Sequence, residues 1–131
     1  MKIWSGSTKH PPCPKEDVEQ TLLVRWASHH WLGEHLFAIP NGGLRNKRVA
    51  TLLKAQGVKP GVSDLMLAVP SQDKHGLFVE MKRTKGSKIS KEQQKFIDAR
   101  LLYGYEAKVA YGWKHAVEII TEYLGGSLDA F

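Results

Sequence analysis

The chain has 131 residues, which is enough for one compact domain and too few for two well-packed ones. Hydrophobic residues make up 42% of it and charged residues 24%, a balance that excludes a disordered or low-complexity chain. The 19 Lys and Arg against 13 Asp and Glu give a net charge of +6, which favours an anionic partner if the positive charges are gathered. We expect a single domain over residues 1–131, with residues 1–14 as an N-terminal tail.

The sequence lacks the features of membrane-inserted and disulfide-stapled proteins. No stretch approaches the roughly 18 apolar residues of a membrane span, and residues 1–14 have no apolar core for a signal peptide. A single cysteine, Cys13, excludes an internal disulfide and a cysteine-based zinc site. We therefore expect a soluble, cytoplasmic protein.

The first half of the chain is predicted to form a helix, a strand and a second helix. Residues 15–30 carry apolar side chains at three- and four-residue spacing without Gly or Pro, which predicts a helix. The apolar run 35–39 ends at a Pro-Asn-Gly-Gly sequence, which predicts a strand and a tight loop. Residues 48–56, closed by Gly57, predict a short helix with three side chains facing inward, Val49, Leu52 and Leu53.

The second half is predicted to form two strands, a helix, a strand and a helix. Residues 64–69 and 77–82 are apolar runs joined by a polar loop, which is typical of a hairpin. Ser90 followed by Gln93 is a capping-box pattern that opens a helix ending before Gly104. A strand over 105–111 and an amphipathic helix over 113–124 follow. This order predicts the α/β class, with a mixed sheet of about four strands flanked by helices.

The positive charges are gathered in two runs. No acidic residue lies between Glu34 and Asp64, and neither run contains an acid: the first comprises Arg45, Lys47, Arg48, Lys54 and Lys59, and the second Lys82, Arg83, Lys85, Lys88 and Lys91. One such run is typical of a solvated loop. Two segregated runs favour a polyanion, because neutralising phosphates releases counterions.

The predicted hairpin brings two acids and a lysine to one end of the sheet. Asp64 begins the first strand, and Glu80 and Lys82 close the second. Side chains alternate along a strand, so Glu80 and Lys82 share one face while Val79 and Met81 share the other. Two carboxylates and a backbone carbonyl suffice for a hard cation such as Mg²⁺, and a nearby lysine suits phosphodiester hydrolysis. A surface Glu-x-Lys triplet in an ordinary hairpin is the plainer alternative.

Five short motifs in order give this pattern a family resemblance. The segment Gly61-Val62-Ser63-Asp64-Leu65 and, after it, Phe78-Val79-Glu80-Met81-Lys82 resemble the D…(D/E)-x-K signature of the PD-(D/E)XK nuclease superfamily, with Ser63 where the nominal proline stands. More narrowly, the chain from about residue 15 to 124 is similar to the virus-type replication-repair nuclease (VRR-NUC) domain. The motifs that carry this are Ile39-Pro40-Asn41-Gly42-Gly43 with Arg45, Leu53-Lys54-Ala55-Gln56-Gly57-Val58 leading into Pro60-Gly61, and Ser90 with Gln93.

The resemblance implies a restriction-endonuclease-like core and a metal-dependent endonuclease that uses Mg²⁺ or Mn²⁺. It implies Asp64, Glu80 and Lys82 as catalytic residues, and Asp64, Glu80 and the Met81 carbonyl as metal ligands. The superfamily also places a carboxylate of its first helix near the metal. Glu19 is our candidate, because it shares a helical face with apolar residues and an inward acid is costly unless paired or metal-bound. Glu16 is the alternative.

Four residues are candidates for substrate contact: Asn41, Arg45, Lys54 and Gln93. An Asn-Gly-Gly turn would form in any case, and Gln93 already has a capping-box role, so each has a plainer explanation.

The resemblance further implies a DNA repair enzyme that acts as a homodimer on four-way (Holliday) junctions. A viral or phage origin of the protein is consistent with it. The alternatives are a flap- or nick-directed nuclease beside a helicase, and a nuclease fold that binds nucleic acid without cutting it. A two-fold dimer would present two sites to two symmetric strands. The sequence leaves open which surface dimerises; the C-terminal helix with Leu124, Leu128 and Phe131 offers exposed apolar candidates.

Overall fold

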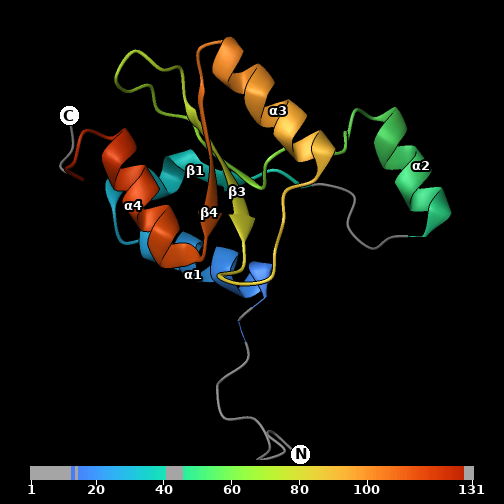
Figure 1. The fold of residues 1–131 in the computed structure, drawn as a ribbon, viewed down its shortest axis with the longest axis horizontal. Coiled ribbons are helices and arrows are strands. Elements are labelled where there is room, and N and C mark those ends of the chain that lie inside the picture. Colours follow the sequence, from blue (N-terminus) through green and yellow to red (C-terminus); the bar gives the residue numbers. More distant parts are fainter. Residues whose placement is uncertain (1–12, 14, 41–45, 129–131) are drawn as a thin grey trace, which may run out of the picture.

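The computed structural model describes residues 13, 15–40 and 46–128, which form one four-stranded sheet covered by helices (Figure 1). In chain order the elements are α1 (Glu16–Ala27), the 3-10 helix η1 (Trp31–His35), β1 (Leu36–Ala38), α2 (Lys47–Ala55), β2 (Leu65–Leu67), β3 (Leu77–Lys82), α3 (Lys91–Leu102), β4 (Glu106–Tyr111) and α4 (Trp113–Tyr123). The predicted α/β class and mixed sheet are confirmed.

The sheet has the strand order β1-β2-β3-β4, in which β1, β2 and β3 run antiparallel and β4 runs parallel to β3. β3 is the central strand of the fold, since all six of its residues are buried. Parallel neighbours need a long crossover connection, and α3 provides it between β3 and β4. The β2–β3 pair has a tight turn in its connecting loop, where Gln72 and Asp73 both have positive φ.

Successive residues of β3 face different helices. Val79 and Met81 belong to the larger core, which α1 and α4 complete. Phe78 belongs to a smaller core that α3 covers through Ile97. Since side chains alternate along a strand, Glu80 lies on the α3 face with Phe78, and it faces away from Val79 and Met81 as the sequence predicts.

The first helix is shorter than its periodicity predicts. It ends at Ala27, and η1 follows before β1 begins. At Gly33 a Cβ atom would lie 2.5 Å from the carbonyl oxygen of Ala27, so the chain folds back tightly against the end of α1. Trp26 and Trp31 pack against the larger core, and Trp31 donates a hydrogen bond from Nε1 to the Leu128 carbonyl (2.6 Å).

The second helix forms where predicted, but its inward-facing apolar side was predicted wrongly. None of the residues of α2 is buried, and Leu52 is 57% exposed. The spacing of Val49, Leu52 and Leu53 correctly indicates an amphipathic helix. It does not reveal whether a neighbouring element exists to cover the apolar face, and α2 lies apart from the sheet beyond α3 (Figure 1).

The C-terminal segment also differs from expectation. Leu124 is only 4% exposed and Leu128 packs against the larger core, so these two candidates were wrongly expected to be exposed. The helix α4 ends at Tyr123, and Gly125 and Gly126 follow with positive φ, as is typical after a helix C-terminus. Phe131 lies outside the described residues. Among the helices that the structure describes, none is long and apolar enough to cross a membrane.

Candidate active site

The register of β2 and β3 brings Asp64 and Glu80 together. Leu65 pairs with Val79, and one step further along the antiparallel ladder Asp64 comes opposite Glu80 on the same face. Asp64 is fixed from the other side as well, because its carbonyl accepts the N–H of Ile39 (2.8 Å). Two acids that fifteen intervening residues separate in the sequence therefore meet at the end of the sheet.

The Asp64 side chain replaces a missing strand contact. The pairing of β2 with β3 ends at Leu65 and Val79, so no residue of β2 lies opposite Met81 to accept its backbone N–H. Asp64 Oδ2 accepts this N–H at 2.7 Å. The bond holds one carboxylate oxygen against the backbone of β3 and fixes the orientation of the side chain beside Glu80.

Glu80 is a buried carboxyl with one satisfied and one unsatisfied oxygen. It is 3% exposed, and its Oε2 accepts a hydrogen bond from Gln93 Nε2 (3.1 Å). Within the described chain, Oε1 is buried and has no hydrogen-bond partner. Burial in the first place, and the charge of Asp64 in the second, raise the pKa of Glu80 to about 9. Two carboxylates this close cannot both stay charged unless a cation compensates them.

Lys82 lies two residues after Glu80, on the same face of β3. It is 8% exposed, which is unusual for a lysine without a function or a charged neighbour. Its charge acts on Glu80 in the direction that lowers the pKa of that carboxyl, opposite to Asp64. The structure thus brings together the three residues that the sequence predicts to converge.

The two carboxylates of α1 have different surroundings. Glu19 is 4% exposed, as its inward face predicts, and its Oε1 accepts the N–H of Trp113 (3.0 Å), the first residue of α4. A negative charge at a helix N-terminus is favourable, so α4 compensates this buried acid. Glu16 is exposed and accepts a hydrogen bond from Ser87 Oγ (2.9 Å), and its charge contributes to raising the pKa of Glu80.

The predicted substrate residues are only partly placed. Lys54 is exposed on α2, while Asn41 and Arg45 lie outside the described residues. Gln93 completes the predicted capping box with Ser90 and in addition donates to Glu80. Sequence reasoning missed this second contact, because spacing identifies the helix cap but not the strand beside it.

The donor set fits a hard divalent cation. Mg²⁺ prefers oxygen ligands, often takes only one or two carboxylates and keeps several waters. Asp64, Glu80 and the Met81 carbonyl match that habit, and the buried, unpartnered Glu80 Oε1 is the observation that supports the fit. Among the described residues no group of three or more His, Cys, Asp or Glu side chains gathers around one point.

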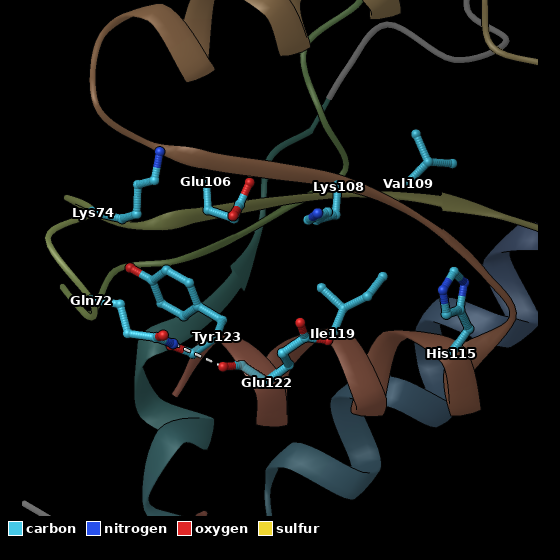
Figure 2. Close-up of a pocket in the computed structure, with 9 residues that line it drawn as sticks. All are labelled: Gln72, Lys74, Glu106, Lys108, Val109, His115, Ile119, Glu122 and Tyr123. Carbon is cyan, nitrogen blue, oxygen red and sulfur yellow. Dashed lines mark hydrogen bonds between the residues drawn. The ribbon is translucent and has the colours of Figure 1, made fainter. Parts of the chain in front are cut away.

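A separate groove lies between the outer edge of β4 and α4 (Figure 2). It has a volume of about 460 Å³ and is lined by Gln72, Lys74, Glu106, Lys108, Val109, His115, Ile119, Glu122 and Tyr123. Gln72 donates from Nε2 to the carbonyls of Glu122 and Tyr123, which ties the hairpin turn to the end of α4. Neither Asp64 nor Glu80 lines this groove, so it is separate from the carboxylate pair.

Comparison with known proteins agrees with this geometry. A family model described as the VRR-NUC domain matches residues 13–114. A solved structure described as a VRR_NUC domain protein is 26% identical, with a TM-score of 0.76 over 92% of this chain and 100% of that chain. No curated protein matches the sequence.

Proposed function

The chain belongs to the VRR-NUC domain family and is a nuclease of the PD-(D/E)XK type, and we propose that it is a divalent-metal-dependent endonuclease that cuts branched DNA. The observation that carries the proposal is the pair Asp64 and Glu80. They face each other at the end of the sheet, and one buried oxygen of Glu80 has no partner in the described chain.

In this proposal Mg²⁺ or Mn²⁺ is held by Asp64, Glu80 and the Met81 carbonyl. A bound divalent cation supplies a water of lowered pKa and neutralises charge on the reacting phosphate. The chain's own contribution is orientation: Met81 N–H holds Asp64 and Gln93 Nε2 holds Glu80. Lys82 places a positive charge on the same face, where it stabilises charge that develops on the phosphate and assists loss of the water proton.

The helix carboxylate is the part of the site that the sequence left open. We assign Glu19 to the cap of α4, because its Oε1 accepts the N–H of Trp113, and this leaves Glu16 as the helix carboxylate for the metal side. Glu19 as the metal ligand remains the alternative, and the two residues predict different outcomes on substitution.

The substrate surface in this proposal follows the cations that flank the site. The run from Arg83 to Lys91 continues directly from the end of β3, and Lys54 lies on the exposed α2. Together with Asn41 and Arg45 these residues would bind the phosphate backbone, which carries no sequence information. An enzyme that contacts only the backbone distinguishes substrates by the shape of the DNA, and in this proposal the substrate is branched. A two-fold homodimer would cut two symmetric strands.

The test is cleavage of a synthetic four-way junction, a flap and a linear duplex of matched sequence, with Mg²⁺ or Mn²⁺. We expect the junction to be nicked preferentially, and EDTA to stop the reaction. Asp64→Asn and Glu80→Gln should abolish cutting while DNA binding is retained. Asp73→Asn, at the exposed turn of the hairpin, is the matched control and should cut like the wild type.

Each contrary result points to a different account. Cutting that persists in EDTA or in the Asp64→Asn protein would defeat the metal-dependent nuclease. Preference for the flap over the junction would replace the resolvase with a flap-directed nuclease. Binding of all three DNAs with no cleavage under any metal would leave a nucleic-acid-binding module.

A further inference from the structure

Gln93 links the first turn of α3 to the carboxylate pair. Its side chain makes two hydrogen bonds at once: Oε1 accepts the N–H of Ser90 (2.9 Å), and Nε2 donates to Glu80 Oε2 (3.1 Å). Ser90 is the N-cap of α3, and its hydroxyl accepts the N–H of Gln93 (3.1 Å) in return. The helix cap and the buried acid of β3 therefore share one side chain.

The capping bond settles which end of the Gln93 amide faces Glu80. A backbone N–H is always a donor, so the amide atom beside Ser90 N must be the oxygen. The nitrogen is then directed at Glu80 and can only donate. A side chain with this orientation recognises a carboxylate oxygen and leaves the other oxygen of the same group free.

The two acids of the site are held in the same manner. Asp64 Oδ2 accepts Met81 N–H and Glu80 Oε2 accepts Gln93 Nε2, so each carboxylate has one oxygen fixed by a neutral donor. The second oxygen of Glu80 is buried without a partner in the described chain. Neutral donors orient the acids and bring no positive charge that would compete with a bound cation.

We propose that Gln93 is a positioning residue of the metal centre: by holding Glu80 Oε2 it directs Glu80 Oε1 toward the cation that Asp64 shares. The inference rests on the proposed function, because it requires that these two acids bind a divalent metal. Outer partners that orient metal ligands typically contribute 10- to 100-fold to metal affinity or activity, so we expect about a 10-fold effect.

The test separates this role from the role of Gln93 in the cap. Gln93→Ala and Ser90→Ala each break one half of the capping box, but only the first removes the donor to Glu80. We expect the two variants to lower Tm by similar amounts. In calorimetric titration of the metal-free protein with Mn²⁺, Gln93→Ala should bind about 10-fold or more weakly than wild type, and Ser90→Ala within about 2-fold of it.

A second variant and a second readout keep the result decisive. Gln93→Met preserves the length of the side chain without a donor, and it should match Gln93→Ala in Mn²⁺ affinity even if the alanine variant folds poorly. The Mn²⁺ concentration that gives half-maximal cleavage should rise by the same factor as the dissociation constant.

The outcomes distinguish this inference from the proposed function. If Gln93→Met and Ser90→Ala bind Mn²⁺ equally well, Gln93 serves the cap alone and the inference is overturned. If the wild-type protein binds no Mn²⁺ at all, the proposed function fails before Gln93 is at issue.

Discussion

At the scale of single residues, Glu80 shows how the fold prepares a charged site. The side chain is almost fully buried, next to Asp64 and two residues before Lys82. An isolated buried carboxylate is costly, and the protein lowers this cost in the metal-free state by keeping a proton on the group. Because a carboxylate must be deprotonated to ligate a metal, a cation bound beside Glu80 would displace this proton.

The pH dependence of stability follows from that shift. The pKa of Glu80 rises from an ordinary value of 4.5 to about 9 on folding, so the folded protein binds more protons than the unfolded chain between these values. Stability from this group is complete below pH 4.5 and is lost as the pH rises toward 9. In urea unfolding of metal-free protein, we expect wild type to lose at least about 1 kcal/mol relative to Glu80→Gln between about pH 5 and 8.

The Glu80→Gln protein serves as the reference for the wild type, because glutamine mimics the protonated acid at every pH. An unchanged difference in unfolding free energy between the two proteins across this range would show that Glu80 titrates normally.

The two carboxylates of α1 predict opposite phenotypes. Glu19→Ala leaves the partly buried Trp113 N–H without its acceptor, and we expect a loss of about 1–3 kcal/mol of unfolding free energy. Glu16→Ala removes an exposed side chain and should change stability by less than about 0.5 kcal/mol, while weakening Mn²⁺ binding. Thermal unfolding and calorimetric titration of both variants provide the measurement. The reverse pattern would make Glu19 the metal ligand.

At the scale of elements, the segment that connects α2 to β2 makes a tight contact with α3 at Gly61. This residue has φ +85°, and a Cβ atom there would lie 2.4 Å from the carbonyl oxygen of Glu92 in α3. The segment before β2 therefore lies directly against the first turn of α3, near the capping box. This contact fixes the approach of the chain to Asp64, three residues later.

Gly57 offers a matched control for this contact. It also has positive φ, +102°, but a Cβ atom at this position would have no neighbour within 4 Å among the described residues. Gly57→Ala should cost only the backbone strain, about 1 kcal/mol, whereas Gly61→Ala should cost at least about 1 kcal/mol more because the chain must move away from α3. Chemical unfolding of both variants measures the difference. Equal losses would mean that the contact at Gly61 does not constrain the fold.

At the scale of the whole molecule, local patterns predicted most of the fold and part of the site. The alternation of side chains along β3 correctly predicted that Glu80 faces away from Val79 and Met81. The pairing of the two hairpin strands correctly predicted that Asp64 lies beside Glu80. Both rules act within one pair of strands. The capping box at Ser90 and Gln93 was likewise local. These predictions needed no knowledge of distant packing.

Features that depend on distant partners were missed or wrong. The contact of Glu19 with Trp113 joins residues far apart in the chain, and no spacing rule indicates it. The hydrogen bond from Gln93 to Glu80 joins α3 to β3. The sequence predicts both elements but not how they pack against each other. For α2 and Leu124, periodicity identified the apolar side correctly and carried no information on whether another element covers it.

Whether a divalent cation binds between the two acids is best decided by a crystal structure of the protein grown with Mn²⁺ and measured for its anomalous signal. We expect a Mn²⁺ peak between Asp64 and Glu80, at coordination distance from Glu80 Oε1, with the Met81 carbonyl beside it. A fully occupied peak elsewhere, such as in the groove between β4 and α4, with none at the two acids, would refute the metal site and the chemistry that depends on it.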